Sequence, residues 1–194
     1  MAIETIAGFS PTIHESAFIA ASGGSHFDPD RAARRARVHN PSLDASAASI
    51  WAWNEGYQQL QAALANDTRF AFETTLGGDT ITETLLDGAR KGAEIAMWFV
   101  GLASPEVHLA RVASRVAAGG HDIPEAKIRE RYRTSRENLI RLLPSLSALQ
   151  VYDNSAEADP KSGQRPEPRL LLTMRNRRIV SLIPLDQMPD WAKP

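Results

Sequence analysis

The 194-residue chain contains no cysteine, which excludes disulfides, thiol nucleophiles and cysteine-ligated zinc. It also lacks a long apolar run, since the longest, Ile95 to Val100, is far too short to span a bilayer. No basic region followed by a cleavage site marks the N-terminus for export. The formal net charge of −1 provides no general attraction to nucleic acid or to anionic membranes. We therefore expect a cytoplasmic protein whose partners include neither nucleic acid nor a membrane.

The composition is that of an ordinary globular protein, with 43% hydrophobic and 23% charged residues. A chain of this length can bury a core without disulfides or metals, so we expect residues 1–194 to form a single domain. The five histidines are scattered along the chain without the close spacing of a ligand pair. We therefore expect no metal site.

Predicted strands and helices alternate along the chain. Short strands are expected at 70–73, 95–102 and 149–152, and the second is a continuous apolar run typical of a strand buried on both faces of a parallel sheet. Helices are expected at about 50–64, from Thr80 as N-cap to about Lys91, from Pro105 and from Pro124. The alternation predicts an α/β fold in which helices flank a parallel sheet. A β-hairpin that turns near Asn176 is expected at about 169–183.

The helix at 50–64 is predicted from large apolar residues that recur at helical spacing. These are Ile50, Trp53, Tyr57, Leu60 and Leu64. Trp51 and Trp53 are two positions apart, so both cannot share one buried helix face. We therefore expect one of the two indoles to be exposed or to lie at an interface.

Two short motifs place carboxylates beside predicted elements. In HFDPDRAARR (26–35), Asp28 and Asp30 precede a run of arginines and can cap the helix that those arginines occupy. In FAFETTLGGDT (70–80), Glu73 ends a predicted strand and is followed by Thr74 and Thr75. Ligands of open α/β sheets bind at the carboxyl edge of the strands, so these three residues are candidates for a substrate site. The alternative is a local turn in which a threonine bonds the backbone.

These motifs, together with GGHDIPEAKIRERYRTSRENL (119–139) and the closing PDW (189–191), resemble the zeta-toxin-like P-loop kinases. The resemblance implies a P-loop NTPase-like parallel sheet, with a lid at about 119–137. It implies that Asp30 takes the proton of the substrate hydroxyl and that Glu73, Thr74 and Thr75 line the acceptor side. It places Arg129 and Arg131 on the transferred phosphate, which the planar guanidinium suits. The alternative for these arginines is a solvated helix face paired with neighbouring glutamates.

The segment Gly8–Ser16 (GFSPTIHES) stands where this family carries its phosphate loop, G-x-x-x-x-G-K-[ST]. Ile13 occupies the second glycine position, His14 the lysine position and Glu15 the serine position. A β-branched residue, a short and mostly neutral side chain and a carboxylate all oppose the binding of a nucleotide phosphate. Gly8, His14, Glu15 and Ser16 are therefore the positions of a degenerate ATP site. The alternative is that the segment is simply a strand and a loop.

Three functions follow from these residues. The first is a pseudo-kinase that binds a nucleotide sugar, an antitoxin or a paralogous kinase and no longer uses ATP well. The second is an active kinase of a small molecule such as UDP-N-acetylglucosamine, with ATP and Mg²⁺ bound by a rebuilt loop. The third is an interaction module whose former crevice is filled by side chains. The first two predict an intact acceptor side.

Overall fold

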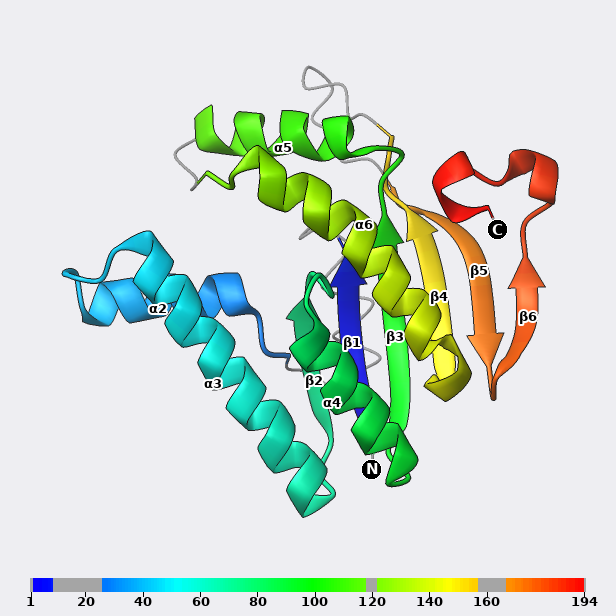
Figure 1. Ribbon diagram of the computed structural model, residues 1–194, viewed down its shortest axis with the longest axis horizontal. Helices are drawn as coiled ribbons and strands as arrows, with labels where there is room; N and C mark the ends of the chain where they lie inside the picture. Colours follow the sequence, from blue (N-terminus) through cyan, green and yellow to red (C-terminus); the bar gives the residue numbers. More distant parts are fainter. Residues whose placement is uncertain (1, 9–25, 118–121, 157–166, 194) are drawn as a thin grey trace.

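The computed structural model describes residues 2–8, 26–117, 122–156 and 167–193 (Figure 1). Its strands are β1 (Ala2–Gly8), β2 (Phe70–Thr74), β3 (Glu94–Gly101), β4 (Ala148–Asp153), β5 (Arg169–Arg175) and β6 (Arg178–Leu182). Its helices are α2 (Pro29–His39), α3 (Ala45–Asn66), α4 (Asp79–Arg90), α5 (Pro105–Ala117) and α6 (Glu125–Leu142). Three short 3₁₀ helices are η1 (Leu143–Ser145), η2 (Leu185–Gln187) and η3 (Asp190–Ala192). Within these ranges, no helix has the length and apolar character needed to cross a bilayer.

The six strands form one mixed sheet in the order β2-β1-β3-β4-β5-β6. The first four are parallel, and β5 and β6 continue the sheet in antiparallel pairing. Ile3 of β1 pairs with Phe70 on one side and with Ile95 on the other, which places the N-terminal strand inside the sheet. The predicted α/β class, with helices around a parallel sheet and a C-terminal hairpin, is confirmed.

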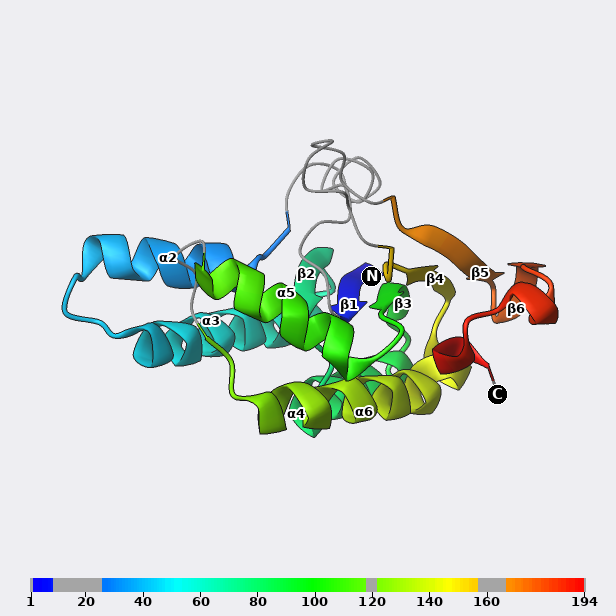
Figure 2. The same cartoon turned by 90° about the horizontal axis from the view of Figure 1, so that it is seen from above.

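Helices α4 and α6 cover one face of the sheet, and the α2–α3 pair extends from its β2 edge (Figures 1 and 2). The main core lies between this covered face and the helices, where Met97 and Phe99 of β3 meet Leu85 of α4 and Leu142 of α6. On the other face of β3, Ala96 and Trp98 are only half-buried, while Val100 is fully buried. The predicted burial of β3 on both faces is therefore complete on one face and partial on the other.

Local sequence explains where the elements begin and turn. The Asp28 carboxylate accepts a hydrogen bond from the Arg31 amide at 3.0 Å and caps α2, as a carboxylate at this position does best. Helix α4 begins after Gly78 and not after the predicted cap Thr80, which lies inside its first turn. The hairpin turns where predicted, because Asn176 and Arg177 adopt φ values of 49° and 61°, as a two-residue type I′ turn requires.

Helix α3 buries a different face from the one predicted. Its buried residues are mostly small, namely Ala48, Ala52, Gly56, Leu60 and Ala63. A Cβ at Gly56 would lie 2.5 Å from the Phe27 ring. Small residues are therefore needed where α3 approaches Phe27. Trp51 and Trp53 are 47% and 45% exposed, so the expected exposure of one indole is confirmed, and Trp53, which belongs to the predicted face, is exposed as well.

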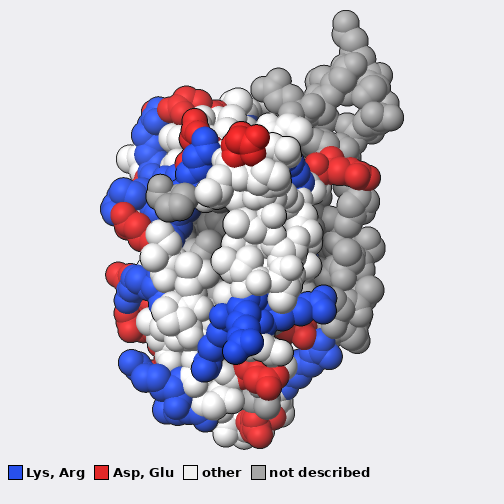
Figure 3. All heavy atoms as spheres, turned by 90° about the vertical axis from the view of Figure 1, so that its right-hand side faces the viewer, with Lys and Arg blue, Asp and Glu red and all other residues white. Residues whose placement is uncertain are grey.

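The C-terminal segment returns to the sheet beside the parallel strands. Trp191 packs on Gly101 at the end of β3 and tilts against Phe99, with ring centroids 6.3 Å apart. Its indole N–H donates to the Asp153 carboxylate at the end of β4, 3.1 Å away. On the opposite side of the hairpin, β6 is the free edge of the sheet and its apolar side chains are exposed, which gives the broad uncharged area in Figure 3.

Candidate functional site

Gly8, the first position of the predicted phosphate loop, lies at the carboxyl end of β1. Gly8 has φ = 112°, and a Cβ there would lie 2.1 Å from the carbonyl oxygen of Val100. Only glycine fits this conformation and this approach to β3. The remaining predicted loop positions, His14, Glu15 and Ser16, lie outside the described residues.

The second predicted motif lies directly beside β2. The Phe27 amide donates to the Ala71 carbonyl oxygen at 2.8 Å, and the Glu73 amide donates to the Phe27 carbonyl oxygen at 2.9 Å. This short parallel pairing extends the sheet by one bridge. It brings Asp28 and the first turn of α2 to the end of β2, where Glu73 stands. The structure therefore joins two motifs that are more than forty residues apart.

Glu73 is the most perturbed carboxyl group of this region. Burial raises its pKa, the Asp28 carboxylate raises it further and Asp30 adds a smaller effect, while His26 opposes them. His26 is buried, and its Nε2 donates to Glu73 Oε1 at 2.9 Å. A carboxyl group with a raised pKa at a strand end is suited to proton transfer. Among the described residues, no group of three or more histidine, aspartate and glutamate side chains is arranged to hold a metal.

The turn after Glu73 is held from both sides. The Thr74 hydroxyl accepts from the Leu76 amide at 3.0 Å, which is the local threonine bond expected as the alternative role. Leu76 is buried and has φ = 53°, a conformation that is strained for a branched residue. Helix α6 fixes this turn, because Asn138 donates to the Leu76 carbonyl oxygen at 3.0 Å and Thr134 donates to that of Gly77 at 2.9 Å. Thr75 is left exposed at its tip.

The two predicted lid arginines point to different surroundings. The aliphatic part of Arg131 packs on Gly77, where a Cβ would lie 2.8 Å from Arg131 Cγ, so this side chain lies against the turn that follows Glu73. Arg129 is exposed and donates to Glu125 and to Glu106, each at 2.7 Å. Residues two apart on a helix face different directions. The structure therefore brings Arg131 to the turn after Glu73, the predicted acceptor side, and does not bring Arg129 there.

Helix α5 contributes a histidine among arginines. His108 is half-buried, and its pKa falls to about 4 because of burial and of the positive charges of Arg115, Arg131 and Arg111, in that order. Arg111 also donates to the carbonyl oxygen of Asn154, after β4, at 2.6 Å. The positive charge of Arg131 on α6 thus reaches His108 on α5 and favours its uncharged form.

The depressed pKa of His108 predicts a loss of stability in mild acid. Below about pH 6.5 the unfolded chain protonates this histidine, whereas the folded protein does so only near pH 4. The free energy of unfolding is therefore expected to fall across this window by about 1–2 kcal/mol more in the protein than in its His108→Gln variant, allowing for solvent screening at a half-exposed site. Urea unfolding at about pH 7 and about pH 4.5 measures it. The exposed His39→Gln variant is the control, and equal acid sensitivity of the protein and the His108 variant would contradict the prediction.

The sequence predicted the positions of Asp28 and Asp30 at a helix start and of Glu73 at a strand end, because such positions are visible in short motifs, and their role in a site stays a prediction. Sequence reasoning missed the role of His26, since the contact with Glu73 depends on the pairing of Phe27 with β2. It also missed the support from Thr134 and Asn138, which look like ordinary helix residues in the sequence. The only local signal for His26 is its place immediately before the FDPD segment.

No family model matches the chain. An uncharacterized protein from Haemophilus influenzae is 30% identical over 105 residues, which cover 54% of this chain and 72% of that protein. The chain belongs to the same family as this protein.

Three solved structures are similar at low identity. A chain of the PezAT chromosomal toxin–antitoxin system of Streptococcus pneumoniae has a TM-score of 0.54 at 14% identity, over 79% of this chain and 68% of that chain. A protein from Chloroflexus aurantiacus proposed to be a kinase has a TM-score of 0.50 at 16% identity, over 67% and 76%. A chain of the AvrRxo1-ORF1:-ORF2 complex with ATP has a TM-score of 0.61 at 13% identity, over 94% of this chain and 60% of that chain. The fold is P-loop kinase-like.

Proposed function

We propose that this protein is a pseudo-kinase with the acceptor half of a P-loop kinase site and an eroded ATP half. The observation that carries the proposal is the convergence at the acceptor side. Glu73 has a raised pKa beside Asp28 and Asp30, and Arg131 packs on the turn that follows. Asp30 and Glu73 are suited to accept or orient a hydroxyl, and Thr75 is exposed to contact it.

The donor half is proposed to be inactive because of three residues that follow β1 in the sequence. Ile13, His14 and Glu15 stand at the positions of the glycine, lysine and serine of a phosphate loop. Together they are expected to weaken binding of a nucleoside triphosphate by about 4 kcal/mol, or about 10³-fold. A protein of this kind acts by binding a ligand or a partner.

The partner class that we propose is an antitoxin-type protein. Two of the similar folds come from the PezAT toxin–antitoxin system and from the AvrRxo1-ORF1:-ORF2 complex. A nucleotide sugar is the small-molecule ligand that we propose for the acceptor side, on the resemblance of the FETTL segment to the zeta-toxin-like kinases. The antitoxin and the nucleotide sugar lead to separate predictions, since only binding of the nucleotide sugar is expected to depend on Glu73.

A second candidate function is an active ATP-dependent kinase. It is favoured by the same acceptor side and by the presence of ATP in the AvrRxo1 complex. In that case Mg²⁺-dependent phosphoryl transfer would depend on Asp30 and Arg131. Arg133→Ala is the matched control for Arg131→Ala, because Arg133 is exposed on the same helix and pairs with Glu137.

Calorimetric titration of Mg²⁺-ATP into the purified protein tests the proposal. We expect no saturable binding up to about 1 mM ATP, as follows from the weakened phosphate contacts. UDP-N-acetylglucosamine is the second titrant, and Glu73→Gln should weaken its binding. ATP binding in the micromolar range, followed by phosphate transfer that Arg131→Ala abolishes, would replace the pseudo-kinase with the active enzyme.

Rebuilding the loop gives the sharper test. The triple variant Ile13→Gly, His14→Lys, Glu15→Ser restores the glycine, the lysine and the hydroxyl of a phosphate loop. We expect it to bind ATP at least about tenfold more tightly than the unaltered protein, as one regained charged contact already provides this. Equal affinity in both proteins would show that these three positions do not face the phosphates.

A further inference from the structure

A cavity lies on the outer side of the His26–Phe27 segment, apart from the acceptor residues. Its volume is about 440 Å³, and it is bounded by α2, α3 and the first residues of β2. The residues that matter for its chemistry are Arg31, Arg35, Arg69, Trp51, Glu55 and His26. Asp28, Asp30, Glu73 and Arg131 are not among its lining residues. This volume falls in the range of sites for small organic ligands.

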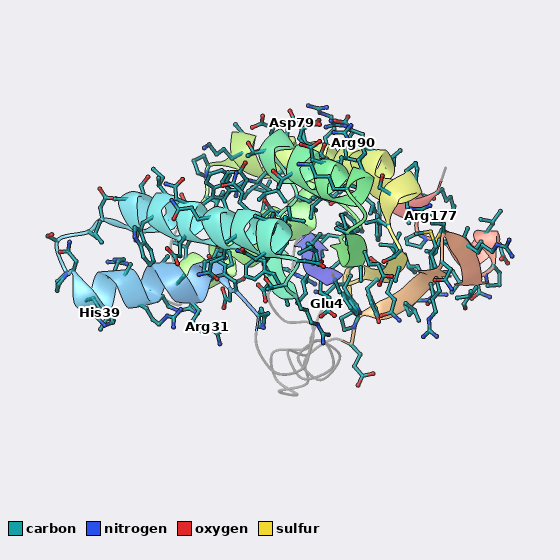
Figure 4. The ribbon with its side chains drawn as sticks, turned by 90° about the horizontal axis from the view of Figure 1, so that it is seen from below. Glu4, Arg31, His39, Asp79, Arg90 and Arg177 are labelled. Carbon is teal, nitrogen blue, oxygen red and sulfur yellow. The ribbon has the colours of Figure 1, made fainter. Side chains whose placement is uncertain are left out.

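The lining is rich in guanidinium groups. Arg31 and Arg35 come from α2 and Arg69 from the position just before β2, and Glu55 is the single carboxylate among the lining residues. Arg31 is held in place because it donates to the His26 carbonyl oxygen at 3.0 Å, and Arg69 pairs with the largely buried Glu4 of β1. Figure 4 labels Arg31, which lies on α2, and Glu4, which lies on β1. Arginines from separate elements that meet at one cavity suit a phosphate group, whose oxygens match the guanidinium fork.

An aromatic ring lies at the same cavity. Trp53 stacks on Tyr57, with ring centroids 5.2 Å apart, whereas Trp51 lines the cavity and has no aromatic partner among the described residues. Half of the Trp51 side chain is exposed. An indole face beside guanidinium groups is a stacking surface for a nucleobase.

The edge of a nucleobase stacked on Trp51 would meet a hydrogen-bond acceptor, the Glu55 carboxylate. Gln59 donates to Glu55 Oε1 at 2.8 Å, which fixes the carboxylate beside the cavity. A carboxylate accepts hydrogen bonds and donates none, so it favours a base that presents an amino group over one that presents an oxygen there. This preference distinguishes the cavity from an acceptor site for a uridine nucleotide.

We propose that this cavity binds a nucleoside monophosphate with an amino-bearing base, of which AMP is the simplest purine. The phosphate lies against Arg31 and Arg35, the base stacks on Trp51 and its amino group faces Glu55. The site is independent of the ATP half and of the acceptor carboxylates. His26 forms a wall of the cavity and also bonds Glu73, so an occupant lies one side chain away from the acceptor side.

Tryptophan fluorescence of the full chain, titrated with AMP, tests the proposal. We expect a saturable change that Trp51→Phe removes. Adenosine and inorganic phosphate each provide half of the contacts, and IMP replaces the amino group by an oxygen, so each should bind at least about tenfold more weakly. Arg35→Ala should weaken AMP binding by a similar factor, since it removes a charged contact. Arg34→Ala is the matched control, because Arg34 is exposed on the same helix and does not line the cavity.

Several outcomes would overturn the proposal. They are equal affinity of the Arg35→Ala and Arg34→Ala variants, a full fluorescence change in Trp51→Phe, equal binding of AMP and IMP, or no saturable change with AMP. Loss of AMP binding in Arg131→Ala would place the nucleotide at the acceptor side and would also overturn it. The result is separable from the proposed function, because ATP titration of the rebuilt loop does not depend on Arg35 or Trp51.

Discussion

Replacement of Gly8 by alanine is expected to lower the free energy of unfolding by about 4 kcal/mol or more, among the largest effects of any single methyl group. The added Cβ would lie 2.1 Å from the Val100 carbonyl oxygen, and a φ of 112° is strained for alanine. Relief requires β1 to move away from β3 in the middle of the sheet. Urea unfolding, followed by circular dichroism, measures the change in midpoint.

Gly92 provides the matched control for this substitution. Its φ is 97°, but an added Cβ would find open space. We therefore expect Gly92→Ala to lower the free energy of unfolding by about 1–2 kcal/mol, from backbone strain alone. The difference between the two variants isolates the contact with Val100. Equal destabilisation would mean that β1 does not reach Val100 in solution.

Removal of the Trp191 side chain is the second large effect. Trp191→Ala is expected to cost about 3 kcal/mol, since it opens a cavity over Gly101 and Phe99. It also leaves the Asp153 carboxylate without the indole N–H. Trp191→Phe keeps a ring in this place, so we expect it to lower the free energy of unfolding only by about the contribution of one hydrogen bond, about 1 kcal/mol.

Lys193 provides the control for Trp191, two residues further along the chain. Its ammonium group pairs with Asp190 in solvent, and such exposed pairs contribute little to stability. Thermal unfolding of Trp191→Ala and Lys193→Ala compares the two positions. A Trp191 variant as stable as the Lys193 variant would show that the C-terminal segment is not docked on the sheet.

Much of the fold could be predicted because its signals are local. The strands at 70–73, 95–102 and 149–152 are short runs rich in apolar residues, and the hairpin carries asparagine where a positive φ is required. The face of α3 could not be predicted in this way. Helical periodicity reports which residues share a face, but the close approach of Phe27 decides in favour of alanine and glycine.

Part of the candidate site could likewise be predicted from the sequence, and part could not. The carboxylates Asp28 and Glu73 were found because strand ends and helix starts of an α/β sheet meet at one edge. The surroundings of the arginines could not be found, since Arg129 pairs with Glu106, which lies on a different helix, α5. Whether Arg129 has a part in any reaction stays a prediction. A charged side chain in a sequence carries no information on its distant partner.

The central position of β1 has a consequence for synthesis on the ribosome. This strand is made before its two neighbours, which are complete only when translation has passed Thr74 and Gly101. Until then the nascent chain exposes a segment, Ile3 to Ala7, that is buried in the folded protein and whose backbone groups have no strand to pair with. The newly made protein is therefore expected to be most prone to aggregation before β3 emerges, and to depend on chaperones during that interval.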